Sequence, residues 1–298
     1  MNREPLDSKS KNIISRRDFI KVASLIGLDM FLGAALGWNY IDKIEPNWVE
    51  VTKVSLKLSR LPKVFSGFRL VQISDIHAGY WMTPERFTSI VELVKDQSPD
   101  LVAVTGDSIL AYGRMPGDKP VLDEFGKVFK KIAGDYETIA VLGNHDYWYD
   151  ADKVKFALER AGARVLKNSV HSLERGGERF HLAGVDDVYE NQDDLGAVLS
   201  ALPQDGGAIL LAHEPDFADF SAATGRFDLQ ISGHSHGGQV ALPIIGPLVL
   251  PHLGQKYPSG LYKVGDMFQY TNRGIGMTSP TIRFNCRPEI TVFTLESS

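Results

Sequence analysis

Residues 139–146 read IAVLGNHD, an apolar run that stops at a glycine and is followed at once by three polar residues. Consecutive apolar residues such as IAVL are typical of a strand that is buried on both faces. Asn144, His145 and Asp146 would then stand just beyond the carboxyl end of that strand. Ligands of open α/β sheets bind in this place, so these three residues are the first candidates for a functional site.

Apolar runs of this kind recur along the chain and alternate with stretches of helical periodicity. PERFTSIVELVKDQ (84–97) and DADKVKFALERAGA (150–163) begin with the proline or acidic residues that suit the first turn of a helix. This alternation predicts a largely parallel or mixed sheet covered by helices. From Gly237 on, short strands and many Gly and Pro residues predict a second, more antiparallel sheet. The predicted strands span residues 69–75, 101–107, 138–143, 180–186, 208–213 and 228–234.

The composition narrows the class of protein. The chain has 298 residues, of which 43% are apolar and 23% charged, which is ordinary for a globular protein with one main domain. A net charge of -5 at pH 7 argues against the coating of nucleic acid, because proteins that do so carry a basic patch. The single cysteine, Cys286, excludes an intrachain disulfide and a zinc site built from several thiolates. Any metal would therefore be held by His, Asp, Asn or Glu.

Histidine is concentrated at the ends of the predicted strands, where five of the eight histidines lie. Carboxylates and imidazoles together suit Mn²⁺, Fe²⁺ and Zn²⁺, and a pair of such ions typically lies about 3.5 to 4 Å apart. We expect the glycines before Asp107, Asn144 and His234 to let the backbone turn sharply and approach the ions closely. The candidate residues at strand ends are Asp75, His77, Asp107, Asn144, His145, Asp146, His213, His234 and His236.

The order of these groups resembles the calcineurin-like metallophosphoesterases. EPNWVEVT (45–52), GVDD (184–187) and NRGIGMTSPTIRFNCRPEITVFTL (272–295) are similar to the bacterial YaeI/YkuE-like phosphodiesterase branch of that family. The resemblance covers nearly the whole chain from Glu45 onward. It implies an α/β fold of the four-layer α/β/β/α sandwich type, and a metal-dependent phosphoric ester hydrolase that uses two divalent ions, Mn, Fe or Zn. The family blocks are Asp-x-His at 75–77, Gly-Asp at 106–107, Gly-Asn-His-Asp at 143–146, His213 and Gly-His-x-His at 233–236.

The resemblance also implies a role for each candidate residue. Asp107 would bridge the two ions, and His145 would approach the scissile phosphate and help to protonate the leaving group. Asn144 would bind metal and stabilise the developing charge while a hydroxide bound between the ions attacks phosphorus in line. We expect Asp146 to orient His145, as carboxylates beside imidazoles often do. The first ion would be held by Asp75, His77 and His236, and the second by Asn144, His213 and His234.

One position departs from the family pattern. The second block usually reads Gly-Asp-x-x-Asp, or has Arg last, whereas this chain has GDSIL at 106–110. The last residue of that block usually supports the site and is not a ligand. Leu110 therefore puts the geometry of the loop or the tuning of the metals in question without removing a ligand.

The branch resemblance favours a phosphodiester or pyrophosphate over a monoester. Related proteins include UDP-diacylglucosamine pyrophosphatases, which makes a lipid-linked or envelope phosphate one expectation, although a cytoplasmic nucleotide-linked lipid would suit an inward-facing domain better. An alternative is a non-catalytic, metal-dependent protein that binds envelope phosphates. Leu110 leaves this alternative open, and His145 argues against it because binding needs no proton donor. A nuclease would use the same site, but the acidic balance disfavours nucleic acid.

The first 44 residues read as a targeting or anchoring segment in front of a domain at 45–298. SRRDFIK (15–21) resembles the twin-arginine export signal, and the mostly apolar residues 22–41 follow it. That run is long enough for a hydrocarbon core of about 30 Å, although Asp29 weakens a permanent span. No clear Ala-x-Ala cleavage site follows. We therefore predict export by the twin-arginine translocase and a retained membrane anchor, with the domain in the cell envelope outside the cytoplasmic membrane.

For several other residues the sequence allows either a packing role or a role in the site. Asp186 and Asp187 either face the substrate or cap a loop. The aromatic residues beside the family blocks either wall the pocket or pack; they are Tyr80, Trp81, Tyr147, Trp148 and Tyr149. Two further groups are expected to have no direct part in the site: His171, His181 and His252 as structural or surface residues, and Arg273, Arg283 and Arg287 as solvated side chains.

Overall fold

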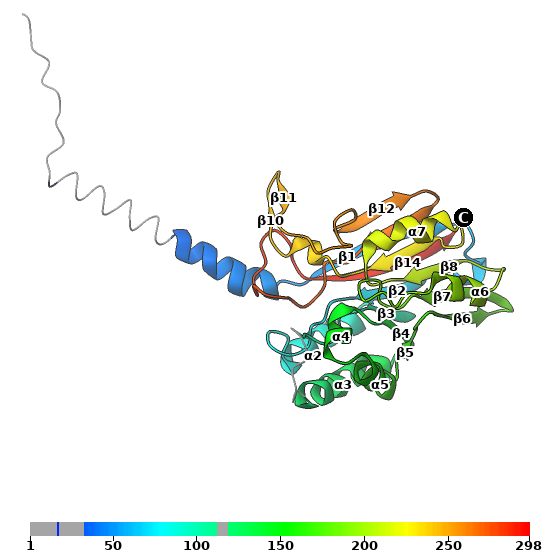
Figure 1. Ribbon diagram of the computed structural model, residues 1–298, viewed down its shortest axis with the longest axis horizontal. Coiled ribbons are helices and arrows are strands. Elements are labelled where there is room, and N and C mark those ends of the chain that lie inside the picture. The colour runs from blue at the N-terminus through cyan, green and yellow to red at the C-terminus, as the bar shows by residue number, and fades with distance from the viewer. Residues whose placement is uncertain (1–16, 18–32, 112–118) are drawn as a thin grey trace, which may run out of the picture.

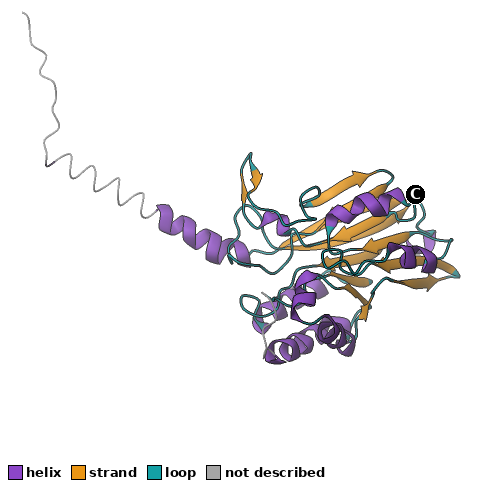
Figure 2. Cartoon of the chain, viewed as in Figure 1, coloured by secondary structure: helices purple, strands orange, loops and turns teal. Residues whose placement is uncertain are grey.

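The computed structural model describes residue 17 and residues 33–111 and 119–298. Two six-stranded sheets lie face to face, and helices cover the outer face of each (Figures 1 and 2). Three apolar cores separate the layers, one between the sheets and one beneath each group of helices. The predicted four-layer α/β/β/α architecture is confirmed.

The first sheet has the order β1-β14-β2-β3-β4-β5 and joins the two ends of the domain. β14 pairs in parallel with β1 and antiparallel with β2, and the remaining pairs are parallel. The last strand of the chain therefore lies inside this sheet, next to the first. The bounds are β1 (Glu50–Leu58), β2 (Phe68–Ile73), β3 (Leu101–Thr105), β4 (Thr138–Val141), β5 (Arg164–Val165) and β14 (Glu289–Ser297).

The second sheet has the order β12-β13-β9-β8-β7-β6. Its four central strands are parallel, and the two edge strands are antiparallel to their neighbours. A short hairpin of β10 (Ala241–Leu242) and β11 (Gly246–Pro247) stands apart from both sheets. The other bounds are β6 (Ser169–Arg175), β7 (Glu178–Gly184), β8 (Ala208–Leu211), β9 (Leu229–Ser232), β12 (Gly260–Val264) and β13 (Met267–Thr271).

The helices bury one face each against a sheet. The first sheet is covered by α2 (Pro84–Lys95), α3 (Lys119–Ala133) and α5 (Ala151–Ala161), and the second by α6 (Leu195–Ala201) and α7 (Ala218–Ala223). α2 begins after Thr83, whose side-chain oxygen accepts a hydrogen bond from the backbone N–H of Arg86. The short helix α4 (Asn144–Tyr149) leaves the end of β4 directly. Single turns lie at η3 (Lys63–Phe65), η4 (Pro215–Phe217) and η5 (His236–Gly238).

All six predicted strands are present, and each ends two residues earlier than predicted, as at Ile73 instead of Asp75. The prediction of a second, more antiparallel sheet from Gly237 on is met only in part. β12 and β13 extend the second sheet beside β9, and β14 enters the first sheet. The Gly and Pro residues of this region mark the β10–β11 hairpin and its loops, and sequence alone does not tell which sheet a short strand joins.

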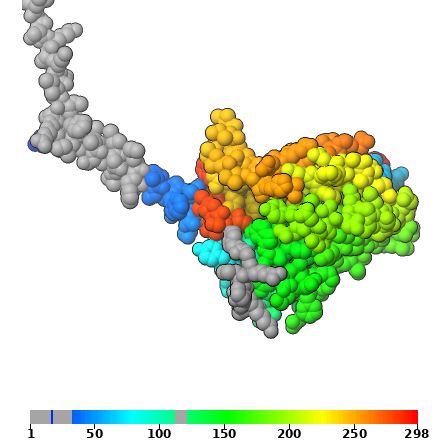
Figure 3. All heavy atoms as spheres, in the orientation of Figure 1, coloured from blue at the N-terminus to red at the C-terminus, as the bar shows by residue number. Residues whose placement is uncertain are grey.

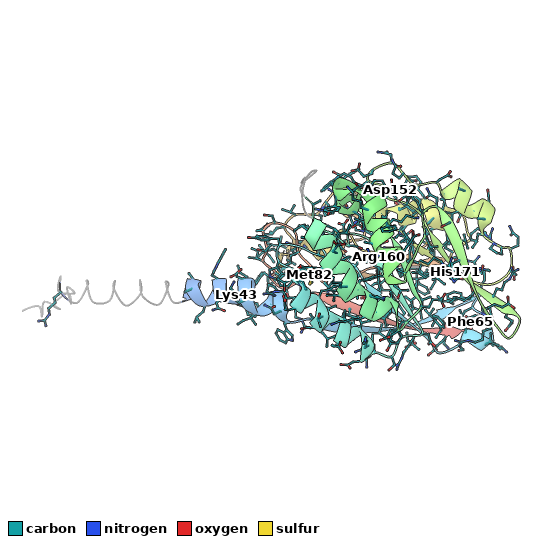
Figure 4. The ribbon with its side chains drawn as sticks, turned by 90° about the horizontal axis from the view of Figure 1, so that it is seen from below. Lys43, Phe65, Met82, Asp152, Arg160 and His171 are labelled. Atoms are coloured by element: carbon teal, nitrogen blue, oxygen red, sulfur yellow. The ribbon has the colours of Figure 1, made fainter. Side chains whose placement is uncertain are left out.

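Residues 33–39 are helical, η1 (Tyr40–Ile44) continues them as a π-helix, and η2 (Glu45–Asn47) follows as a 3₁₀ turn. This helix stands away from the domain at Lys43 (Figure 4), whereas Glu45 is buried. Among the described residues, no helix is both long and apolar enough to span a bilayer. Most of the twin-arginine motif and residues 22–32 lie outside the described part of the chain. The anchor and the domain boundary at Glu45 therefore stay predictions.

Phe180 tests how much the core between the sheets contributes to stability. Its side chain is fully buried and packs against Phe65 and Phe68. We expect Phe180→Ala to lower the free energy of unfolding by about 3 to 5 kcal/mol, because the sheets cannot close around the cavity. Phe156→Ala, at an exposed position on α5, should change it by less than about 0.5 kcal/mol. Denaturant titration followed by circular dichroism compares them, and equal losses would contradict the assignment.

Candidate metal centre

The carboxyl ends of five strands meet at one place and bring the predicted ligands together. Oxygen and nitrogen atoms of these residues fall into overlapping groups, each with all atoms within 4.8 Å of one another. One group is Asp75, His77 and His236, and a second is Asp75, Asp107 and His213. All seven predicted ligands are buried: Asp75, His77, Asp107, Asn144, His213, His234 and His236.

His77 and His236 define one side of the centre. Their Nε2 atoms lie 3.0 Å apart, and the rings are stacked with centroids 5.0 Å apart. His236 Nε2 is 3.4 Å from Asp75 Oδ1, and His77 Nε2 is 3.6 Å from Asp107 Oδ2. Burial lowers the pKa of both imidazoles, so both rings are neutral near pH 7. Two neutral rings therefore each place Nε2 near a different buried carboxylate, His236 near Asp75 and His77 near Asp107.

His234 and Asn144 show most directly that this geometry suits a cation. His234 Nε2 lies 2.8 Å from the carbonyl oxygen of His252, which accepts its proton. Nδ1 of the neutral ring then has a lone pair, and it faces Asn144 Oδ1 at 3.1 Å. Burial and the charge of His213 lower the pKa of His234, which favours this neutral form. Two acceptors that face each other without a proton fit a metal ion bound by both.

His213, like His234, is oriented by a backbone carbonyl oxygen. Its Nδ1 lies 2.7 Å from the carbonyl oxygen of Thr105, which orients the ring. Nε2 points to Asp107 Oδ2 at 3.2 Å without hydrogen-bond geometry within the described structure. Burial opposes a charged ring here, but Asp107 raises the pKa of His213 well above its usual value. The electrostatic field of the carboxylate therefore favours positive charge at this point.

The pKa values of the two buried carboxylates, Asp75 and Asp107, are shifted in opposite directions. Burial raises the pKa of Asp75 to about 7, and the charge of Asp107 adds to the shift, against the effect of His213. Burial alone would also raise the pKa of Asp107, but His213 and His145 hold it well below the usual range. Asp107 is thus the anionic centre of the cluster.

The backbone at the ligands adopts conformations that non-glycine residues rarely take. Asp75, His77, Asp107, His234 and His236 all have φ between 48° and 66°. Such left-handed conformations cost free energy and persist at functional sites where the surroundings fix them. This explains why β2, β3 and β9 end two residues before Asp75, Asp107 and His234, since a residue with positive φ cannot continue a strand.

The glycines beside the predicted ligands meet the prediction only in part. Gly106 has a positive φ of 93°, as expected for a sharp turn, but Gly143 is extended with φ -124°. A Cβ at Gly143 would collide with Asp107 and His213, and one at Gly233 with Ser74 and Asp75. These two glycines are therefore needed for close approach, and the ligands themselves make the turns.

His145 lies beside the cluster at the start of α4. Its backbone N–H donates to Asp107 Oδ1 at 2.9 Å, and its Nδ1 lies 2.7 Å from the carbonyl oxygen of Ala111. Because a carbonyl oxygen can only accept, the contact with Ala111 places the ring proton on Nδ1, and Nε2 points away from Ala111. The ring centroid is 4.6 Å from that of His77. His145 is therefore adjacent to the predicted ligands, and its ring is oriented by the carbonyl oxygen of Ala111.

The prediction that Asp146 orients the His145 ring is corrected. Asp146 Oδ1 accepts from the backbone N–H of Ile109 at 3.0 Å, and Oδ2 from that of Gly143 at 3.1 Å. Burial and the charge of Asp107 raise the pKa of Asp146 to about 7. Asp146 thus joins the loop after β3 to the loop after β4. Spacing in the sequence made it a neighbour of His145, but its side chain points to the backbone of the two loops.

The loop with Leu110 is held mainly by backbone hydrogen bonds. Leu110 N–H donates to the carbonyl oxygen of Ala78 at 3.1 Å, and Ala78 N–H donates to that of Ser108 at 3.0 Å. His77 N–H donates to the carbonyl oxygen of Asp107 at 2.9 Å. Together with Asp146, these bonds fix the loop after β3 although position 110 lacks the usual acid.

An aromatic wall stands over His145 and His234. The Trp148 ring lies 4.5 Å from the His145 ring, and Tyr189 lies 6.0 Å from both Trp148 and His234. Tyr147 turns elsewhere, because its hydroxyl donates to Asp186 Oδ2 at 2.6 Å. Of the predicted wall residues, Trp148 is thus placed at the centre, whereas Tyr147 packs away from it.

Glu214 and Tyr189 are functional candidates that the sequence reading missed. Glu214 is fully buried and accepts from the backbone N–H groups of Val188 and Tyr189, which positions Tyr189. Burial, followed by the charge of Glu214, raises the pKa of Asp187 to about 10, so Asp187 is protonated and can share its proton with Glu214. Asp187 therefore holds a loop. The signal for Glu214 was available, because it directly follows His213 in ILLAHEP.

The remaining expectations are partly met. His171 pairs with Glu137, and His181 contacts Ser172 and the carbonyl oxygen of Asp205, as expected for structural residues. The prediction that Arg283 is solvated is wrong. Its side chain is fully buried and donates to the carbonyl oxygens of four residues. These are Arg273, Gly274, Gly276 and Cys286. Arg273 and Arg287 are partly exposed, and both pair with Glu50.

The same motifs are found by comparison with known proteins. The sequence profile described as Calcineurin-like phosphoesterase matches residues 68–238, which include all the strand-end residues above. This chain belongs to that family. Calcineurin-like phosphoesterases are hydrolases of phosphoesters that use two divalent metal ions, and the clustered His and Asp residues fit such a pair.

Individual relatives cover nearly the whole chain. The uncharacterized metallophosphoesterase YkuE of Bacillus subtilis is 34% identical over 96% of this chain and 99% of its own. Phosphodiesterase YaeI of Escherichia coli is 28% identical over 95% of this chain and 100% of its own. A solved structure, the NAD nucleotidase of Haemophilus influenzae, aligns over 70% of this chain and 45% of that chain with 17% identity and a TM-score of 0.47.

Gly143→Ala tests the close packing of the centre. Because the new Cβ would displace Asp107 or His213, we expect loss of bound metal and a fall in turnover of roughly 100-fold or more. Gly126→Ala, where a Cβ meets open space, is the matched control and should keep metal and activity. Metal content by mass spectrometry and initial rates compare the two. Retention of both by Gly143→Ala would show that the loops relax.

Proposed function

We propose that this metallophosphoesterase hydrolyses a phosphodiester or pyrophosphate bond, and that Asp75, His77, Asp107, Asn144, His213, His234 and His236 hold its two metal ions. The observation that carries the ligand assignment is the pair of facing acceptors, His234 Nδ1 and Asn144 Oδ1, at 3.1 Å. The assignment of the first ion to Asp75, His77 and His236 rests on their close grouping.

The residues fit hard or borderline divalent ions. The donor set mixes carboxylate, amide and imidazole groups, which suits Mn²⁺, Fe²⁺ or Zn²⁺. When bound, such a pair lowers the pKa of water toward neutrality and offsets negative charge on the phosphoryl group. The protein supplies the orientation, because Thr105 and His252 carbonyl oxygens fix the rings of His213 and His234.

His145 is the proposed proton donor to the leaving group. With Nδ1 donating to Ala111, its Nε2 is the atom that can transfer a proton. Its backbone N–H is held by Asp107 Oδ1, so the ring is fixed relative to the metal ligands. Asn144 directly precedes His145 in the chain and contributes to stabilising the developing charge. A protein that only bound phosphate would not need this donor, which favours hydrolysis over the non-catalytic alternative.

The preference for a diester or pyrophosphate rests on the relatives. YaeI, which aligns over 95% of this chain, is named a phosphodiesterase. The N-terminal SRRDFIK motif supports export by the twin-arginine translocase, and the apolar run after it supports a membrane anchor. An anchored domain in the cell envelope would meet lipid-linked phosphates, and we propose this class of substrate.

Turnover of bis-p-nitrophenyl phosphate tests the reaction class. We expect the full chain loaded with Mn²⁺ or Zn²⁺ to hydrolyse it, and Asp107→Asn to lose both metal and turnover, because Asp107 is the anionic centre of the cluster. Rates with the monoester p-nitrophenyl phosphate provide the comparison. Faster turnover of the monoester would overturn the proposed preference.

His145→Ala separates catalysis from binding. We expect kcat to fall by roughly 100- to 10,000-fold while metal content stays unchanged, because the variant removes a proton donor and leaves the ligands in place. His171→Ala removes a histidine that pairs with Glu137 on the protein surface and should keep full activity. An unchanged kcat in His145→Ala would argue against this role.

A further inference from the structure

The β10–β11 hairpin presents an apolar surface to solvent. Relative exposure reaches 108% at Ile244, 72% at Ile245, 54% at Leu248 and 76% at Val249. Residues 240–254, VALPIIGPLVLPHLG, contain no Asp, Glu, Lys or Arg. Single exposed apolar residues are ordinary, but a contiguous exposed apolar patch marks an interaction site.

The backbone conformation at the tip of the hairpin is also unfavourable. Ile244 has φ 72°, a left-handed conformation that is a true outlier for a β-branched residue. Asn or Gly would be the ordinary choice at such a turn position. The chain therefore places its most exposed isoleucine where the backbone also disfavours it. Such a combination points to a function for the isoleucine side chain.

The hairpin is structurally joined to the N-terminal helix. Ala241 N–H donates to the carbonyl oxygen of Phe284 at 2.9 Å, and Arg283 N–H donates to that of Ile41 at 3.0 Å. The segment around Arg283 thus connects the base of the hairpin to the end of the helix. Figure 3 shows the gold hairpin and the blue helix projecting from the same end of the molecule, with the orange segment between them.

The exposed side chains of that helix have the same character. Leu36 and Trp38 have relative exposures of 71% and 60%. Trp is favoured where a membrane meets water, because one end of the ring system is apolar and the other can bond to water. In the sequence, the helix continues the apolar run of residues 22–41.

We propose that the tip of the β10–β11 hairpin, Ile244, Ile245, Leu248 and Val249, inserts into the surface of a lipid bilayer beside the N-terminal helix. The hairpin would form a second membrane contact that fixes the orientation of the domain. This inference goes beyond the proposed hydrolysis and does not depend on it.

A bilayer fits this surface better than a second protein chain. A stable protein interface buries about 800 Å² on each partner in a packed, complementary patch. This apolar surface is instead the tip of a hairpin whose strands have two residues each. A narrow apolar projection without charges can enter a fluid acyl layer to a depth of roughly 5 to 10 Å without a matching hollow.

The position of the hairpin gives this contact a consequence for the metal centre. The hairpin begins shortly after His236 and is followed by His252, whose carbonyl oxygen accepts from His234. A domain seated on the hairpin would therefore hold the metal centre close to the membrane surface. Its orientation would favour phosphates at the headgroup level over those far from the membrane.

Depth-dependent quenching tests the insertion. An environment-sensitive fluorophore is attached to Ile244→Cys in the full chain, which is reconstituted into vesicles of phosphatidylcholine and phosphatidylglycerol. The native Cys286 is buried and will not react in the folded protein. The control is Glu178→Cys, at an exposed position on β7, far from the hairpin in Figure 1. Hydrolysis of bis-p-nitrophenyl phosphate and near-ultraviolet circular dichroism check that both variants fold.

We expect a spin-labelled lipid with its quencher near the headgroup end of the acyl chain to quench the label at position 244 at least about two-fold more than the label at 178. Equal quenching at the two positions would overturn the proposal. An emission shift at position 244 that depends on protein density in the vesicles, without lipid quenching, would also overturn it and would indicate contact between protein copies.

Discussion

The structure of the site depends on the burial of Asp75 and Asp107 within 4.8 Å of each other and of a ring of imidazoles. Burial disfavours the charge on each carboxylate, and each charge also repels the other. Uncompensated, such a pair is costly, because charges are normally buried only when they are paired or bind a metal. The neighbouring rings do not offset this charge fully, since burial keeps His77 and His236 neutral. Two divalent ions would neutralise the buried negative charge. Metal binding would therefore also stabilise the local structure of the site.

The loops around this centre hold their unfavourable conformations through one another. Asp75 N–H donates to the carbonyl oxygen of Gly106, and Gly233 N–H donates to that of His213. Gln72 adds a connection between the two sheets, because its side-chain amide donates to Thr105 Oγ1 and to the carbonyl oxygen of Ser232. Each strand end is thus fixed by a neighbouring one. The left-handed conformations of the predicted ligands therefore depend on contacts within the first sheet and between the two sheets.

Much of this arrangement could be predicted from the sequence, because strand periodicity and strand-end chemistry are local signals. The runs that end before Asp75, Asp107 and Asn144 were recognisable from apolar residues followed by polar ones. The direction in which a side chain points could not be predicted from the sequence. Asp146 follows His145 in the chain, yet its oxygens bind the backbone at Ile109 and Gly143. Likewise, the short strands after Gly237 had the right local pattern, but their sheet partners are set by long-range packing.

Arg283 shows most clearly why the remainder escaped prediction. A buried guanidinium normally requires a carboxylate, and nothing in the sequence near position 283 indicates burial. In the structure its N–H groups donate to carbonyl oxygens at Arg273, Gly274 and Gly276, which are drawn into one turn. Gly276 N–H then donates to the carbonyl oxygen of Asp75. The arginine therefore supports Asp75, a predicted metal ligand, through two backbone turns. Such a role depends on the assembled fold, and only the positions of the carbonyl groups can reveal it.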